Sequence, residues 1–273
     1  PPTIAELEDF TSDPGTANYE RQVDRLLASP AFGERLASYW LGLVRYASTV
    51  GYHGDQDHAI APYRDWVIDA INRNLPFDQF TIEQIAGDLL PEATLDQRIA
   101  TGFNRCNITT AEGGAIPEEL NVRYMVDRVE TTATVFMGLT AGCAVCHDHK
   151  YDPITQEDYF RFRAFFEPLE VRNDRVPGGP ELPKYIRYKP GSGASLKPGG
   201  QGLARIYDHT LDATTRMYRL GDQRDLFEER EPAEPGIPAF LGELPQAISM
   251  IELPPEAHYP GSKRFIQQAE AQS

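Results

Sequence analysis

The chain has few cysteines for its length and is short of positive charge. Its 273 residues include three cysteines, and 26 lysines and arginines stand against 41 aspartates and glutamates, so the formal net charge is −15. A surface field of that sign repels nucleic acid and anionic membranes, and it suits cationic or neutral partners. No apolar run approaches the roughly 18 residues that a membrane span needs. The sequence therefore predicts a globular protein with neither a transmembrane segment nor a nucleic-acid partner.

Two of the three cysteines, Cys143 and Cys146, stand just before His147. Such a pair can be a disulfide, a redox dithiol or half of a zinc site. Zinc needs two more ligands at a recognisable spacing, and the third cysteine, Cys106, is alone. A thioredoxin-like dithiol follows a strand, and no βαβ pattern precedes this pair. Covalent haem attachment requires a Cys-x-x-Cys-His run, because both thiols can add to vinyl groups while the imidazole reaches the iron. The motif favours haem c, with a disulfide or a metal as open alternatives.

The chain before the motif is predicted to be a run of helices. The first segment, up to Gly15, is acidic and is expected to be irregular. Helical spacing then begins at Tyr19 and is expected to end at Ser29 and Pro30, because a residue before proline is biased away from the α region. The next helix carries a broad apolar stripe that we expect to be buried, formed by Leu36, Tyr39, Trp40, Leu43 and Val44.

Three further helix starts are predicted from capping boxes, in which a threonine and an acidic or amide residue three positions later satisfy each other's backbone amides. These pairs are Thr81 with Gln84, Thr94 with Gln97, and Thr155 with Asp158. Pro117 is expected to begin the long helical stretch 118–139 that leads to Cys143. Aromatic residues are expected to line the inner face of the helix after Thr155, either as a roof over a porphyrin or as ordinary core: Tyr159, Phe162, Phe165 and Phe166.

Beyond Pro168 the composition changes to proline- and glycine-rich loops. Short β-like runs are predicted at residues 185–188, 205–207 and 217–220. The fold class expected is therefore mainly α. A multi-helix haem c domain at residues 19–168 is followed by a small β or irregular proline-rich extension at residues 169–273.

Several blocks around the motif can be considered together: Tyr63–Ile68, Leu75–Thr81, Gln84–Pro91, Ala100–Phe103, Glu112–Gly114, Asp127–Val129 and Gly138–Pro153. In combination they resemble the planctomycete cytochrome c family of large exported proteins, over about residues 19–168. The resemblance implies one haem c in a helical domain of a longer chain. It implies that Cys143 and Cys146 are the thioether anchors and His147 the proximal iron ligand. Members often lie near polysaccharide-degrading functions, which implies a carbohydrate link.

The sixth iron position is left open by a departure from the family. Where many members read Asn-His-Met, this chain reads Cys106, Asn107 and Ile108, so no histidine or methionine there can bind iron. His53, in a glycine-flanked loop that can approach a flat ligand, is the distal ligand we predict, with Met125 as the alternative.

The leading functional hypothesis is electron transfer by an exported haem c protein, periplasmic or on the cell surface, because such haem is attached outside the bacterial inner membrane. A redox enzyme acting on a carbohydrate-type substrate is the alternative, and its candidate catalytic residues are His53, Asp55, Glu112, His149 and Asp152. A third hypothesis is a structural module stabilised by its haem. His149 is expected to anchor a hydrogen-bond network with Asp152 rather than to cross the porphyrin plane.

The partners expected are a redox protein and a surface on which the C-terminal region docks. Residues 222–273 are proline-rich and carry apolar side chains with no evident core to receive them: Phe240, Leu241, Ile248, Ile251 and Leu253. An extended segment of this kind buries apolar residues by wrapping a partner. We therefore expect a second domain or another chain to bind there.

Overall fold

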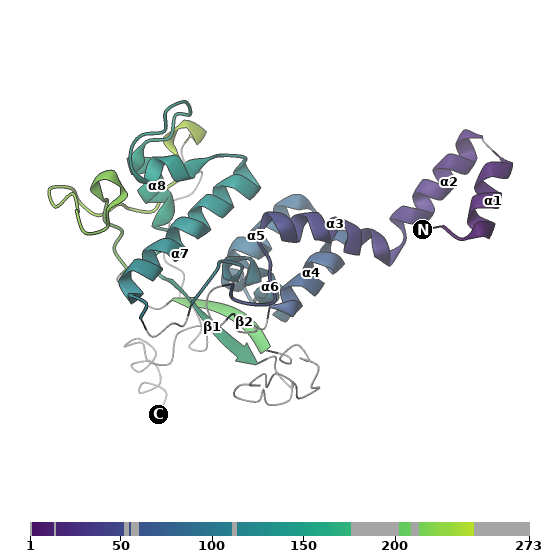
Figure 1. Cartoon of the computed structure of the whole chain (residues 1–273), viewed down its shortest axis with the longest axis horizontal. Coiled ribbons are helices and arrows are strands. Elements are labelled where there is room, and N and C mark those ends of the chain that lie inside the picture. Colours follow the sequence, from purple (N-terminus) through teal and green to yellow (C-terminus); the bar gives the residue numbers. More distant parts are fainter. Residues whose placement is uncertain are drawn as a thin grey trace.

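The computed structural model describes residues 2–13, 15–51, 55, 60–110, 114–175, 202–208 and 213–242. Within these ranges the chain is mainly helical, as predicted, with eight α-helices and one antiparallel pair of strands. The helices are α1 (Ile4–Ser12), α2 (Thr16–Leu27), α3 (Pro30–Leu43), α4 (Ala61–Asn72), α5 (Phe77–Ala86), α6 (Leu95–Ala100), α7 (Pro117–Thr132) and α8 (Gln156–Arg163). The strands are β1 (Leu169–Arg175) and β2 (Gly202–Asp208). Figure 1 shows α3 to α6 as one helical group and α7 with α8 as another, with the two strands between them.

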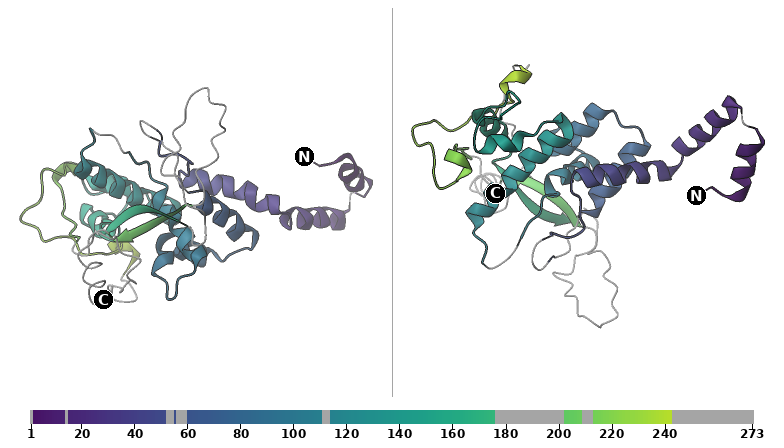
Figure 2. Two further views of the ribbon diagram at one scale, coloured as in Figure 1. Left: turned by 90° about the horizontal axis from the view of Figure 1, so that it is seen from below. Right: turned by 45° about the horizontal axis from the view of Figure 1, so that its top comes forward.

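The N-terminal residues form a helical hairpin, so the expectation of an irregular segment up to Gly15 was wrong. The Thr3 hydroxyl accepts the backbone N–H of Glu6, and the Glu6 carboxylate accepts the backbone N–H of Thr3. This capping box is visible in the sequence, and its helix-starting effect prevails over the acidic composition. Figure 2 shows the hairpin of α1 and α2 projecting from the rest of the molecule, and α1 buries none of its side chains.

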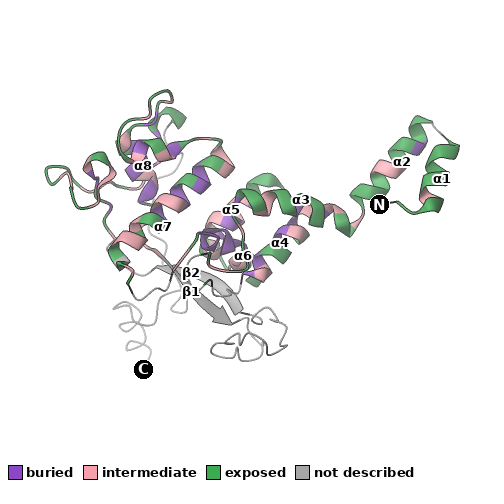
Figure 3. Ribbon diagram, in the orientation of Figure 1, coloured by how far each residue is buried: buried purple, intermediate pink, exposed green. Residues whose placement is uncertain are grey.

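The apolar stripe of α3 is only partly buried. Val44, just after the helix, is fully buried, and Trp40 packs against the core. Leu36, Tyr39 and Leu43 are exposed, so their assignment to the core was wrong. The reason is that α4 covers one face of α3, where the backbone N–H of the tightly packed Gly33 donates to Asn72 Oδ1 at 2.9 Å. Figure 3 shows this contrast between the two sides of the helix.

The first core lies among α3 to α6 and is organised by one buried amide. Gln84 Oε1 accepts hydrogen bonds from Trp40 Nε1 at 2.9 Å and from Tyr63 Oη at 2.7 Å. Gln84 Nε2 donates to the carbonyl of Phe80 at 2.9 Å. A buried amide whose oxygen and nitrogen are both paired holds three helices in one register.

The capping predictions had mixed outcomes. Capping boxes are confirmed at Thr94 before α6 and at Thr155 before α8, and Pro117 is the first residue of α7. Thr81 is not a cap. It lies inside α5, which begins after Pro76, and its hydroxyl donates to the Phe77 carbonyl at 2.8 Å. A threonine that bonds back into its own helix satisfies no terminal amide.

The predicted stretch to residue 139 is α7 followed by a π-helical turn, Ala133–Met137. Gly138 ends it with a left-handed backbone at φ 66°. The second core lies around α7 and α8 and includes Tyr159, Phe160 and Phe166. Phe165 is exposed and Phe162 only partly buried, whereas Phe160 is fully buried and was not predicted. Tyr159, Phe160 and Phe166 are thus core residues, and a roof over a porphyrin stays a prediction.

Strand β1, the first element after α8, pairs with the distant strand β2. Residues 205–207 lie in β2, as predicted, and β1 was not predicted. Residues 217–220 do not form a strand: Tyr218 makes a single bridge with Leu226, and a 3₁₀ turn, Arg219–Gly221, follows. Residues 185–188 lie outside the described residues. We call residues 213–242 the arm; Met217 and Tyr218 of the arm belong to the second core.

Candidate functional site

The Cys-x-x-Cys-His motif begins on a 3₁₀ turn, Ala141–Val145, and Cys146 is the residue that caps its end. A 3₁₀ helix has three residues per turn, so side chains at positions i and i+3 lie on the same face. Ala141 and Ala144 are buried in the second core and hold one face of the turn inward. Cys143 and Cys146 share another face, and both are exposed and unpaired. The disulfide alternative therefore does not describe this structure.

Gly142 fits the turn against α7. A Cβ at this position would meet the carboxylate of Glu130, so glycine leaves room for that side chain against the turn. Partial burial raises the pKa of Glu130, and the nearby carboxylate of Asp127 adds to the effect while Arg45 opposes it. Arg45 Nη2 is 2.8 Å from Asp127 Oδ2. The motif thus has an acidic neighbour on α7.

His147 is exposed beside the two thiols. Its Nδ1 lies 2.7 Å from the backbone carbonyl of Asp148. A carbonyl accepts hydrogen bonds, so this contact assigns the proton to Nδ1 and leaves the lone pair of the neutral ring on Nε2. His147 is therefore prepared to bind a metal through Nε2.

His149 anchors the loop after the motif, and its predicted network with Asp152 is present. Nδ1 accepts the backbone N–H groups of Tyr151 at 3.2 Å and Asp152 at 2.7 Å, and it lies 3.5 Å from Asp152 Oδ2. Nε2 is 3.4 Å from Thr140 Oγ1. Because Nδ1 accepts two backbone hydrogen bonds, Nε2 is the ring nitrogen that faces Thr140 as a donor. His149 thus fixes the backbone between the motif and α8.

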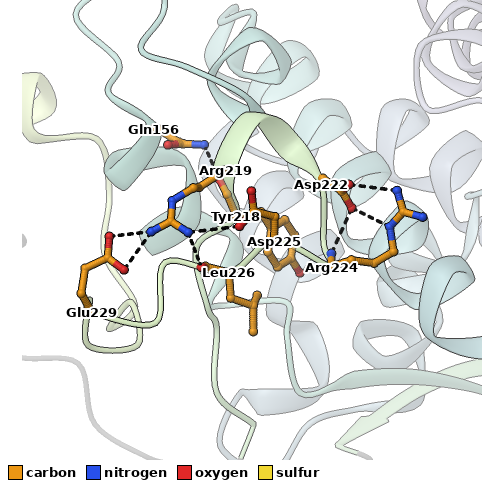
Figure 4. A network of polar contacts seen from close by, with 8 residues as sticks. All are labelled: Gln156, Tyr218, Arg219, Asp222, Arg224, Asp225, Leu226 and Glu229. Atoms are coloured by element: carbon orange, nitrogen blue, oxygen red, sulfur yellow. Dashed lines mark hydrogen bonds and ion pairs between the residues drawn. The ribbon is translucent and has the colours of Figure 1, made fainter.

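Gln156, the first residue of α8, joins the motif to the arm. Its Nε2 donates to the carbonyl of Val145 and to the carbonyl of Tyr218, each at 2.9 Å, and its backbone N–H donates to Asp148 Oδ1 at 2.8 Å. Figure 4 shows Gln156 reaching the arm at Tyr218. One side chain therefore holds the motif turn and a segment about sixty residues later in the chain.

The arm turns tightly next to the second cysteine. Gly221 has a left-handed backbone at φ 75°, and a Cβ built on it would lie 2.5 Å from Cys146 Sγ and 3.4 Å from Val145 Cγ1. The space that a side chain at 221 would need is thus occupied by the sulfur of Cys146. Glycine is the residue that permits both this backbone conformation and this close approach.

Ion pairs stiffen the arm around this turn. Arg219 contacts Asp225 at 3.1 Å and Glu229 at 2.8 Å, and its guanidinium lies 4.6 Å from the centre of the Phe227 ring. Arg224 hydrogen-bonds Asp222 through its side chain and its backbone N–H, which lowers the pKa of Asp222 to about 2. These groups are at the surface, where single ion pairs add little stability, so their role is to define the shape of the loop. Figure 4 shows both clusters.

Asp55 and Met125, the other predicted site residues that the structure describes, make their contacts away from the motif. His53 and Glu112 lie outside the described residues. Asp55 Oδ1 accepts the backbone N–H of Gly51 at 2.8 Å, a contact within its own loop. Met125 is buried in the second core, with Sδ 3.8 Å from Arg128 Nη1. His53 or Met125 as the distal iron ligand therefore stays a prediction.

The third cysteine is a core residue. Cys106 is buried in the first core, and its Sγ lies 3.5 Å from the carbonyl of Gly102. Burial raises the pKa of its thiol to about 12. Among the residues that the structure describes, no group of three or more histidine, cysteine, aspartate or glutamate side chains is arranged to hold a metal ion.

Comparison with protein families matches residues 1–171 to PSCyt2, a protein of unknown function (DUF1549). The chain belongs to the PSCyt2 family. This match confirms the resemblance to the planctomycete cytochrome c family drawn from the motif and its surrounding blocks. Neither a search of curated proteins nor a search of solved structures returned a match. In the described part of the PSCyt2 chain, no helix combines the length and apolarity needed to cross a membrane.

The family match ends close to the predicted domain boundary at residue 168, and that boundary stays a prediction. Sequence reasoning missed Gln156 and Gly221, because neither belongs to a recognisable motif. Docking of residues 222–273 on a second domain or another chain also stays a prediction. Residues 213–242 pack against α8 of the same chain, whereas Ile248, Ile251 and Leu253 lie outside the described residues.

Proposed function

We propose that this PSCyt2 chain carries one covalently attached haem c and transfers electrons. The observation that supports the proposal is the pair of exposed, unpaired thiols, Cys143 and Cys146, on one face of a 3₁₀ turn directly before His147. Membership of a family whose name refers to a cytochrome agrees with it. The donor set fits the group: two thiols for thioethers and one imidazole whose Nε2 carries the lone pair.

The chain's own groups have distinct roles in this proposal. Cys143 and Cys146 would anchor the cofactor, and His147 would bind the iron through Nε2 while its Nδ1–H stays on the Asp148 carbonyl. His149 holds the backbone between the motif and α8, and Gln156 holds the motif turn at Val145, so the ligands stay oriented. When bound, a haem c supplies a one-electron iron couple whose potential depends on ligation and burial.

The proposed haem c also implies a cellular location and a kind of redox partner. Haem is attached to such motifs outside the bacterial inner membrane, so the proposal implies a protein of the periplasm or the cell surface. The net charge of −15 favours a redox partner with a basic contact face. A link to polysaccharide breakdown rests on the family resemblance alone. Asp55 and His149 accept backbone N–H groups of their own loops, and the Asp152 carboxylate lies 3.5 Å from His149 Nδ1. None of these contacts favours the enzyme alternative over electron transfer.

A pyridine haemochrome assay on protein from a host that matures c-type cytochromes tests the proposal. The parent chain should carry one covalent haem. The Cys143→Ala/Cys146→Ala double variant should carry none, and Cys106→Ala should keep its haem, because Cys106 is in the first core. A parent chain without covalent haem would refute the proposal.

Stopped-flow oxidation of the reduced protein by a basic cytochrome separates electron transfer from a purely structural haem. The rate should fall as salt is added, because screening weakens attraction between opposite charges. A haem that neither reduces nor reoxidises reversibly would favour the structural alternative.

A further inference from the structure

The arm lies beyond the family-matched residues 1–171, yet it touches the motif at its second cysteine. The neighbours that a Cβ at Gly221 would meet are Cys146 Sγ, Val145 Cγ1 and Cys146 Cβ. The arm therefore lies directly on the cysteine that precedes His147. In this side-chain conformation, a group bonded to Cys146 Sγ would lie next to this turn of the arm.

The turn is held on both sides of Gly221. Before it, the Tyr218 carbonyl accepts from Gln156 Nε2, and the buried Tyr218 ring meets Phe160 edge-on, with ring centres 5.1 Å apart. After it, the Asp222 backbone N–H donates to the Arg219 carbonyl at 3.0 Å, and the Arg219 backbone N–H donates to the Asp225 carbonyl at 2.8 Å. The turn cannot move off Cys146 without breaking several of these contacts.

We propose that the arm forms one wall of the haem attachment site, and that Gly221 is a positioning residue that lets this wall reach Cys146. The inference rests on the proposed function. Each thioether forms when a thiol S–H adds across a haem vinyl group. The sulfur bonds to the inner vinyl carbon and the hydrogen goes to the outer one, so no electrons are gained or lost. The sulfur of Cys146 then carries a bulky substituent next to Gly221, where a side chain would compete for the same space.

Gly221→Ala tests the wall, with Gly138→Ala as its matched control. Both glycines have left-handed backbones, at φ 75° and 66°, so alanine strains both positions similarly. A Cβ at Gly138 meets nothing within 4 Å, whereas a Cβ at Gly221 meets Cys146. Peptide mass spectrometry of protein from the maturing host counts the thioethers. We expect Gly221→Ala to lose the thioether at Cys146 while keeping the one at Cys143, and Gly138→Ala to keep both.

A second variant tests the contact without haem. In chain made without haem maturation, Gly221→Cys should form a disulfide with Cys146, because the new Cβ lies close enough for bridging after a small adjustment. Oxidised glutathione accepts the two electrons and two protons released, giving two reduced glutathiones. Gly138→Cys should form no such bridge. Peptide mapping identifies the partner, and a Cys143→Ala background removes the competing thiol.

The readouts separate two kinds of failure. A parent chain without covalent haem overturns the proposed function. If the parent does carry haem but Gly221→Ala keeps both thioethers and Gly221→Cys forms no bridge, only the inference about the arm is overturned. Because the cross-link is read in the chain without haem, it still decides the arm's position if Gly221→Ala folds poorly.

Discussion

Replacing Asp158 by alanine should detach the arm and weaken the start of α8 together. Asp158 is buried, and its Oδ2 accepts the Thr155 backbone N–H at 3.0 Å and the Thr155 hydroxyl at 2.8 Å. Its Oδ1 accepts the backbone N–H of Ala239 in the arm at 2.9 Å. Losing a helix cap costs about 1 kcal/mol. Losing a charge-assisted hydrogen bond costs about 1.5–3 kcal/mol. The free energy of unfolding should therefore fall by about 2.5–4 kcal/mol.

The stabilisation that Asp158 provides should depend on pH. Burial alone would raise the pKa of Asp158, but the hydrogen bonds from Thr155 and Ala239, with the nearby charge of Arg161, hold it below its ordinary value. A carboxyl whose pKa is lowered by folding stabilises the protein fully above the unfolded pKa, about 3.9. That contribution is lost as the pH falls through the still lower folded pKa. The difference between parent and variant should therefore be constant near neutral pH and shrink in strong acid.

Urea unfolding at several pH values, together with limited trypsin digestion, measures both parts of the effect. Gln97→Ala is the matched control, because Gln97 completes the capping box of α6 and its side chain contacts Glu83 of α5 rather than the arm. The control should lose about 1 kcal/mol and leave trypsin cleavage at Arg219 and Arg224 unchanged. Asp158→Ala should lose more and be cleaved faster there. If the two variants lose equal stability and are cleaved equally, the hydrogen bond to Ala239 does not hold the arm.

Three further predictions concern the cores. Gln84→Ala should lower the free energy of unfolding by about 1–3 kcal/mol, because the buried Tyr63 hydroxyl loses its acceptor while Trp40 Nε1 keeps a contact with Tyr63 Oη at 3.3 Å; an unchanged free energy in urea unfolding would contradict the network. Tyr159→Phe should leave stability unchanged or raise it by about 1 kcal/mol, because the buried Tyr159 hydroxyl has no hydrogen-bond partner in the described structure; a clear loss on thermal unfolding would mean that the hydroxyl has one. Folded chain without haem should react with a thiol reagent at two cysteines and unfolded chain at three, because burial raises the pKa of Cys106 to about 12; a third fast-reacting thiol in the folded chain would contradict its burial.

The features that sequence reasoning predicted correctly depend on neighbours in the chain. The capping boxes at Thr94 and Thr155 need only three residues each, and both are present. The spacing of Cys143 and Cys146 gives a shared face on a single turn, which the 3₁₀ geometry provides. The cap predicted at Thr81 was wrong because α5 begins one turn earlier, after Pro76, which places the threonine inside the helix.

The features that could not be predicted depend on distant parts of the chain. The stripe of α3 looked like core, but only the neighbouring α4 decides which of its faces is covered, so Leu36 and Leu43 are exposed. The contact between Gly221 and Cys146 joins residues far apart in sequence and carries no local signal. A glycine between Leu220 and Asp222 predicts a turn, but the local pattern does not indicate that this turn lies next to Cys146 Sγ.

The long separations between the arm and α8 have a consequence for the order of folding. Gln156 and Tyr218 are 62 residues apart, and Asp158 and Ala239 are 81 residues apart. Closing a loop of that length costs roughly 3.7 kcal/mol of chain entropy beyond a constant, before any contact compensates. Helix α7, the motif turn and α8 are neighbours in sequence and can assemble first, whereas the arm joins late. During folding, both motif thiols are thus presented on a nearly formed surface before the second core is complete, and that interval is when a bulky group reaches Cys146 most easily.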